Sequence, residues 1–266
     1  MKSQRNLNKL ISRFYHGKDL SPDNKWKSNH TTQSLQDYST AYVDNKGRTS
    51  VYFDGIEDVL VQLTQRSEIV VGAVAWLTND RILECLANVK HAGIVVQKED
   101  FLRRDVDVKS YSKWKNSLRS RYDQLPAFEF EDFVETYPGQ QEEHPDFNPA
   151  TQNWLFDASG GYQFGGSAIR CLGYTSSINA VIPRMHHKFL IFGDKVEGLI
   201  MRPHTIATGS FNMTKNATRS RENIVVMENS AICHAYLSEW AQLWSMSEAL
   251  DWTSKEPALQ TIDMST

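Results

Sequence analysis

The chain from residue 51 to residue 97 alternates between short apolar runs and segments with helical spacing. The apolar, β-branched runs Val51–Phe53, Glu68–Trp76 and Ile94–Gln97 are predicted to be strands. Between them, apolar residues recur three and four positions apart, as they do on one face of a helix. This alternation of strands and helices predicts an α/β fold in which helices cover a central sheet.

Residues that favour helix ends mark the boundaries of the two helices. Asp54 is predicted to cap the first helix, and Asn79 or Asp80 is predicted to open the second. Gly93 is placed where it could end the second helix.

The second half of the chain shows the same two periods. The run Phe189–Phe192 is apolar on both faces, which predicts a fully buried strand. Thr205–Gly209 and Ile224–Met227 are predicted to be the next strands. Apolar residues between 232 and 244 follow helical spacing, which predicts a closing helix that packs on the core or on a second subunit.

Polar side chains stand at the ends of these strands. His186 and Lys188 should enter the buried strand two residues apart, so they should point to the same side, while His187 points to the other. Ser210 and Asn212 repeat this two-residue offset where the following strand ends. Imidazole, ammonium, hydroxyl and carboxamide groups are suited to holding and attacking a phosphodiester.

The order His186-x-Lys188, then an Asp, then Gly209-Ser210-x-Asn212 and finally Glu222-Asn223 resembles the signature of the phospholipase D superfamily. The resemblance implies a layered α/β/α sandwich with a mixed central sheet. It also implies phosphoryl transfer that needs no metal and no other cofactor, in which one histidine attacks phosphorus and a second protonates the leaving oxygen.

The same resemblance implies a role for each motif residue. Lys188 and Asn212 would hold the non-bridging oxygens of the phosphate, and Ser210 could donate a further hydrogen bond. Glu222 would accept a hydrogen bond from the far nitrogen of His186 and so set its tautomer and orientation.

The Asp of the signature is displaced in this chain. Gly193 occupies its expected place and Asp194 follows one residue later, so Asp194 is interpreted as structural. The segment Lys195–His204 is longer than expected for the turn, which predicts an enlarged hairpin beside the site.

The signature occurs once in the chain, whereas the mechanism needs two histidines. His16-Gly17-Lys18-Asp19 has the first spacing, but it lies in a polar segment without a buried strand after it. We therefore expect a homodimer in which a two-fold axis brings His186 of each chain to one phosphate.

Length and composition fit one such domain. The 266 residues are 40% hydrophobic, enough for a sizeable core. We predict a polar, basic arm at 1–48, a catalytic domain at 49–252 with an insertion at 98–167, and a tail at 253–266.

A basic stretch interleaved with aromatic residues lies in the predicted insertion. Cations suit phosphate and aromatic rings suit stacked bases, although a charged helix face is often only solvated. The candidate nucleic-acid contacts are Arg103, Arg104, Lys109, Tyr111, Lys113, Trp114, Lys115 and Arg119. The following segment 129–146 contains seven acids and no Lys or Arg, so it either covers a basic groove or is an ordinary exposed loop.

These observations favour a nuclease acting on DNA or RNA, although the net charge of -3 does not itself favour a duplex partner. The alternatives are a phospholipid phosphodiesterase or transphosphatidylase, which would need an apolar interfacial surface, and an inactive nucleic-acid-binding protein of the same fold. With three scattered cysteines and no apolar run long enough to span a membrane, we expect a cytoplasmic protein without a membrane partner. Because adjacent strand residues point apart, His186 and His187 do not predict a metal site.

Overall fold

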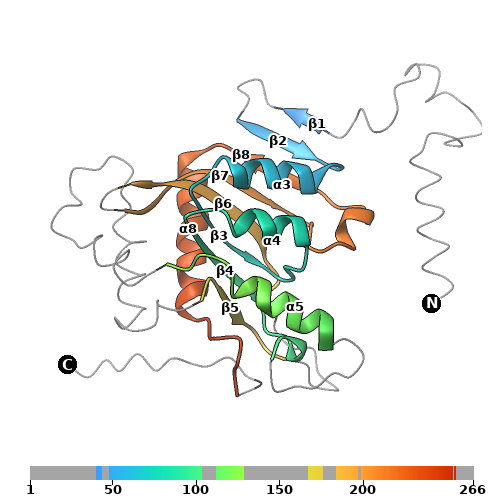
Figure 1. Cartoon of the computed structure of the whole chain (residues 1–266). Helices are drawn as coiled ribbons and strands as arrows, with labels where there is room; N and C mark the ends of the chain where they lie inside the picture. Colours follow the sequence, from blue (N-terminus) through green and yellow to red (C-terminus); the bar gives the residue numbers. More distant parts are fainter. Residues whose placement is uncertain are drawn as a thin grey trace, which may run out of the picture.

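A computed structural model of the protein shows a central β-sheet with helices on both faces (Figure 1). The residues that it describes are 40–43, 48–103, 112–128, 167–175, 184–196, 199–253 and 255.

The sheet is mixed, as predicted. Its eight strands are in the order β1-β2-β8-β7-β6-β3-β4-β5. The neighbours β3, β4 and β5 are parallel, and all other neighbouring pairs are antiparallel. The strands are β1 (Thr40–Val43), β2 (Thr49–Tyr52), β3 (Ile69–Val74), β4 (His91–Gln97), β5 (Ile169–Leu172), β6 (Lys188–Val196), β7 (Leu199–Gly209) and β8 (Ile224–Met227).

Helices cover the two faces of the sheet unequally. Figure 1 shows α3 (Ile56–Gln65), α4 (Asp80–Leu86) and α5 (Ser112–Tyr122) on one face and the long α8 (Ser230–Ser245) on the other. The layered α/β/α arrangement expected from the sequence is therefore confirmed. Short 3-10 turns include η2 (Asp100–Leu102) and η4 (Ala217–Arg219).

The strand β6 separates the two halves of the hydrophobic core. Leu190 and Phe192 pack into the cluster beneath α3 and α4, whereas Phe189 and Ile191 pack into the cluster beneath α8. All four side chains are buried. Pairing with β3 on one edge and β7 on the other fixes the register of this strand, so the residues just before it are held at a defined place on the sheet edge.

Gly93 does not end a helix, contrary to the sequence-based expectation. Helix α4 ends at Leu86, and Gly93 lies inside β4. A Cβ atom at this position would lie 2.9 Å from the ring of Trp240, whose Nε1 donates a hydrogen bond to the Gly93 carbonyl at 2.9 Å. Glycine is needed here because α8 packs directly against the backbone of the strand.

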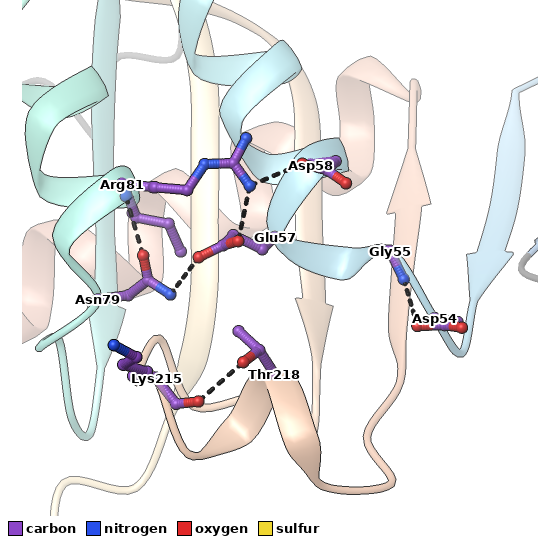
Figure 2. A network of polar contacts seen from close by, with 9 residues as sticks. Asp54, Gly55, Glu57, Asp58, Asn79, Arg81, Lys215 and Thr218 are labelled. Atoms are coloured by element: carbon purple, nitrogen blue, oxygen red, sulfur yellow. Dashed lines mark hydrogen bonds and ion pairs between the residues drawn. The ribbon is translucent and has the colours of Figure 1, made fainter.

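The predicted N-cap is found in α4 but not in α3. Asn79 caps α4, with its Oδ1 accepting from the amide of Ile82 at 3.1 Å, as predicted (Figure 2). The N-cap of α3 is Gly55 and not Asp54, and its φ of 61° lies in the left-handed region. Asp54 instead accepts from the amide of Gly55 at 2.8 Å.

Strands β6 and β7 extend through most of the segment Lys195–His204, which the sequence predicts to be an enlarged hairpin. Pairing extends to Val196 opposite Leu199. This turn lies at the far end of β6 from His186, so the expectation of an enlarged hairpin beside the site is wrong.

Two segments assigned to peripheral regions contribute to the folded domain. Residues 40–43 of the predicted arm form the edge strand β1, which pairs with β2. Within the predicted insertion, Leu118, Tyr122 and Leu125 are buried in the core.

Candidate active site

Several strand ends meet at one edge of the sheet, and the candidate residues lie there. The register of β3 with β6 pairs Val74 with Lys188, so the end of β3 lies beside the start of β6. Gly209, at the end of β7, likewise lies opposite Ile224, at the start of β8. Lys188 is the first residue of β6, and His186 lies two residues before it. Ser210 directly follows the end of β7, with Asn212 two residues further on, and Glu222 lies two residues before the start of β8.

The predicted pair His186 and Lys188 is in direct contact. The Lys188 Nζ lies 3.2 Å from the His186 Nε2 and donates to the His186 carbonyl at 2.9 Å. Because an ammonium group has only donors, Nε2 is the acceptor in the first contact. His187 lies on the other side, with its Nε2 3.3 Å from Glu239 on α8, as the alternation of strand side chains predicts.

The electrostatic surroundings of His186 favour the neutral imidazole. Partial burial lowers the pKa of His186 below its ordinary value, and the charges of Lys188 and Arg184 lower it further. Burial also lowers the pKa of Lys188, while the nearby charge of Glu222 opposes that shift. A neutral imidazole retains the lone pair that a nucleophile needs.

Glu222 contacts Ser210 and not the imidazole, which corrects the role implied by the resemblance. The Ser210 hydroxyl donates to Glu222 Oε2 at 2.5 Å. The same hydroxyl accepts from the amide of Asn223 at 3.1 Å, and the Ser210 amide donates to the Asn223 carbonyl at 3.0 Å. In this arrangement, Glu222 holds the end of β7 against the start of β8.

The loop after β7 positions Asn212 through its neighbour. The Met213 carbonyl accepts from the amides of Thr78 at 2.8 Å and Asn79 at 2.9 Å. The carboxamide oxygen of Asn212 is buried and has no hydrogen-bond partner among the described residues. This oxygen is an acceptor, so a phosphate would have to bind the Nδ2 donors of the same carboxamide.

A polar network anchors the residues that hold this loop (Figure 2). Arg81 on α4 donates to Glu57 at 2.7 Å and to Asp58 at 2.8 Å on α3. Glu57 also accepts from the Asn79 side chain at 2.6 Å. Both helices thus fix the segment on which the Met213 backbone rests.

Four residues around His186 were not identified from the sequence. The Trp76 ring packs edge-on against the imidazole, with centroids 6.0 Å apart. Glu99 accepts from Trp76 Nε1 at 3.2 Å and from Arg184 at 3.1 Å. Gln97 accepts from the amide of residue 185 at 2.7 Å. Trp76, Gln97 and Glu99 lie at or just beyond the carboxyl ends of β3 and β4. Ligands commonly bind at this edge of α/β sheets, so the predicted strand ends could have identified these three residues.

Part of the predicted nucleic-acid contact does not face solvent. Lys115 is 3% exposed and donates to the Arg103 carbonyl at 3.0 Å. Arg119 is 6% exposed and binds the Leu102 carbonyl and Asp251. The expectation that these two cations contact nucleic acid is wrong, because their charges are used inside the domain.

The other residues of the predicted nucleic-acid contact are exposed, half-buried or outside the described residues. Lys113 and Trp114 are exposed, and the Trp114 ring lies 5.7 Å from that of Phe101. Arg103 is half-buried. Several predicted features lie outside the described residues, namely Arg104, Lys109, Tyr111, the acidic segment 129–146 and the motif-like residues 16–19.

Asp194 lies eight residues along the chain from His186, toward the other end of β6. Its carboxylate oxygens lie 3.6 Å from Arg202 and 3.9 Å from His204, both on β7. This position agrees with a structural role in the hairpin. In the part of the chain that the structure describes, no three His, Cys, Asp or Glu side chains gather as a metal site would require, and no helix could cross a membrane.

The layered sheet and the polar set at its edge belong to one α/β domain, and part of this domain matches a known family. A family model described as "Cardiolipin synthase, PLD-like domain" matches residues 157–244, which include all five candidate residues. The chain belongs to the phospholipase D superfamily.

A relative matches most of the chain. An uncharacterized protein of Acanthamoeba polyphaga mimivirus is 30% identical over 217 residues, which are 82% of this chain and 71% of that protein.

Solved structures with a similar fold include two bacterial proteins. Nuc from Salmonella typhimurium, described as a phospholipase D family member, is 16% identical with a TM-score of 0.39 over 77% of this chain and 98% of its own. NucT from Helicobacter pylori is 13% identical with a TM-score of 0.42 over 76% of this chain and 98% of its own.

Proposed function

We propose that this protein is a metal-independent nuclease that cleaves DNA or RNA through a covalent phosphohistidine in a homodimeric active site. The observation that carries the proposal is the contact between Lys188 and His186, at the sheet edge that also holds Ser210, Asn212 and Glu222. The set combines a neutral imidazole, a cation and an amide at one edge of the sheet.

In the first step, His186 Nε2 attacks phosphorus and a P–N bond forms. Lys188 must leave Nε2 for this attack, and a phosphate oxygen offers its ammonium a stronger, charge-assisted partner. The bond from phosphorus to the leaving oxygen breaks, and that oxygen takes a proton from His186 of the partner subunit. Lys188 and Asn212 stabilise the negative charge on the non-bridging oxygens.

In the second step, water replaces the imidazole. The now neutral second histidine takes a proton from the water, whose oxygen bonds to phosphorus as the P–N bond breaks. This step restores both imidazoles to their starting protonation states. Ser210 and Glu222 act by holding the strand ends together, and the charge of Glu222 balances that of Lys188.

Nucleic acid is the proposed substrate because cations flank the site beyond the reacting groups. Lys215, Arg219 and Arg221 are exposed on the loop between Asn212 and Glu222. Such a loop suits a chain of phosphates more than a single lipid headgroup.

A cleavage assay in EDTA tests the proposal. Single- and double-stranded DNA, RNA and phospholipid vesicles would be incubated with the wild type and with His186→Ala. We expect wild-type protein to cut at least one nucleic acid and His186→Ala to be inactive. Loss of all cleavage on metal removal, restored by a divalent ion, would contradict the mechanism, and cleavage of phospholipid alone would replace the substrate class.

A further inference from the structure

Arg184 lies beside the proposed nucleophile and has no part in the mechanism described above. It stands two residues before His186, which in turn stands two residues before Lys188. The charge of Arg184 acts on His186, and both side chains contact the group formed by Trp76 and Glu99. The guanidinium of Arg184 is therefore held on the same side of the segment 184–188 as the imidazole of His186, but farther from β6.

One carboxylate oxygen organises this group. Glu99 Oε1 accepts from Trp76 Nε1 at 3.2 Å and from Arg184 Nη1 at 3.1 Å. The Glu99 side chain is 18% exposed and that of Arg184 is 39% exposed, so the guanidinium lies on the outer side of the pair. Glu99 is positioned to orient the guanidinium.

The guanidinium retains donors for another ligand. It carries five N–H donors, and Glu99 is its ion-pair partner among the described residues. The planar donor fork matches the geometry of phosphate, which can accept two parallel hydrogen bonds. Alternate residues on an extended segment are separated by roughly 7 Å, a distance that one nucleotide unit can span.

We propose that Arg184, oriented by Glu99, binds the phosphate next to the scissile one on a nucleic-acid chain. This inference rests on the proposed function and deepens it, because a substrate with a single phosphodiester cannot fill this second site. The cations of the loop 215–221 lie on the strand β8 side of the reacting groups and Arg184 lies on the β4 side, so the bound chain would cross the sheet edge between them.

Comparison of a short and a long substrate tests this inference. Bis-(p-nitrophenyl) phosphate offers one phosphodiester, whereas a single-stranded oligonucleotide of about ten nucleotides offers several. We expect Arg184→Ala to lower kcat/KM for the oligonucleotide about tenfold more than for the small diester, since a charge-assisted hydrogen bond is lost only in the former. The slope of log kcat/KM against log salt should also fall by about one for the oligonucleotide.

Two further variants separate binding from structure. Arg184→Lys keeps the charge without the donor fork and should lie between wild type and Arg184→Ala. Arg202→Ala removes an exposed arginine at the other end of the sheet and should leave both rates unchanged. Equal losses of Arg184→Ala on both substrates, or no loss on either, would overturn the inference.

A binding measurement keeps this result independent of catalysis. Fluorescence anisotropy of a labelled oligonucleotide in EDTA gives Kd without turnover, and Arg184→Ala should raise Kd about tenfold. Binding without cleavage, still weakened by Arg184→Ala, would reject the proposed reaction and support this subsite. An unchanged Kd would reject the subsite even in an active enzyme.

Discussion

Close packing of the backbone explains why the residue before Ser210 in the motif is a glycine, Gly209. A Cβ atom at this position would clash with the carbonyl oxygen of Asn223, the residue just before β8. Glycine is needed here because it leaves room for the neighbouring backbone, and not because it adopts a positive φ. The Ser210–Glu222 contact depends on that close packing.

We predict that Gly209→Ala separates the two strand ends. Overpacking at such a position costs about 1–3 kcal/mol, and kcat should fall further because Asn212 moves with Ser210. Urea unfolding and kcat under fully folded conditions provide the measurements. Gly193→Ala is the matched control, since its Cβ would lie 2.5 Å from the Arg202 carbonyl away from the site. It should lose stability but keep kcat, and the same kcat for both variants would contradict the prediction.

The protonation of His186 sets the expected pH dependence. Burial, Lys188 and Arg184 all disfavour the imidazolium, so the pKa of His186 is lowered. A lowered pKa means that the ring stays neutral to a more acidic pH than an ordinary histidine, whose pKa is about 6.5. The acid limb of the kcat/KM profile should therefore lie below this value.

An NMR titration of the labelled imidazole tests the cause directly. Lys188→Met removes the nearest positive charge and should raise the pKa of His186 toward its ordinary value. Lys195→Met, at the other end of β6, should leave it unchanged. A wild-type pKa at or above the ordinary value would refute this account of the electrostatics.

At the level of secondary-structure elements, a buried ion pair ties the segment after α8 to the end of β4. Lys98 is fully buried, and its Nζ contacts Glu248 Oε1 at 2.5 Å. Cys171 on β5 exchanges backbone hydrogen bonds with the same Glu248. The segment after α8 thereby continues the edge of the sheet beside β5.

We predict that Glu248→Ala lowers the free energy of unfolding by about 3–5 kcal/mol, because the ammonium of Lys98 is left buried without its carboxylate. The double variant Lys98→Met with Glu248→Met should recover most of this loss, since no buried charge remains. Urea unfolding measures both. The exposed pair of Arg81 and Asp58 provides a control, and Asp58→Ala should have a much smaller effect. A double variant no more stable than the single one would contradict the prediction.

For the whole molecule, the described residues of one chain place one histidine at the proposed reacting position. His187 lies on the opposite side of the strand, toward α8. We therefore propose that the acid comes from a second chain, so that assembly is part of the proposed mechanism.

Mixed dimers test this requirement. Wild-type and His186→Ala chains with different tags would be co-expressed and the heterodimer isolated. If each phosphate needs an imidazole from both chains, the heterodimer should lose activity by about a hundredfold or more, as expected for removal of one acid–base group. Half of the wild-type activity in the heterodimer, or an active monomer in light scattering, would show that each chain acts alone.

The sequence by itself determined the features that depend on local periodicity. Strand alternation separated His186 and Lys188 from His187, and apolar spacing gave the layers of the sandwich. The two-residue offset of Ser210 and Asn212 after a strand was also readable, because each pattern spans only a few residues.

The tertiary structure alone decided the contacts between segments far apart in the chain. Gly93 lies in a strand on which Trp240 packs, and the buried Lys115 donates to the carbonyl of Arg103, just after the turn η2. Glu222 binds Ser210, and Arg184 meets Glu99, because strand order brings these ends to one edge. The local sequence contains the spacing of apolar residues and the preference of each residue for helix or strand. The contact partner of a side chain depends instead on which elements become neighbours in the folded sheet.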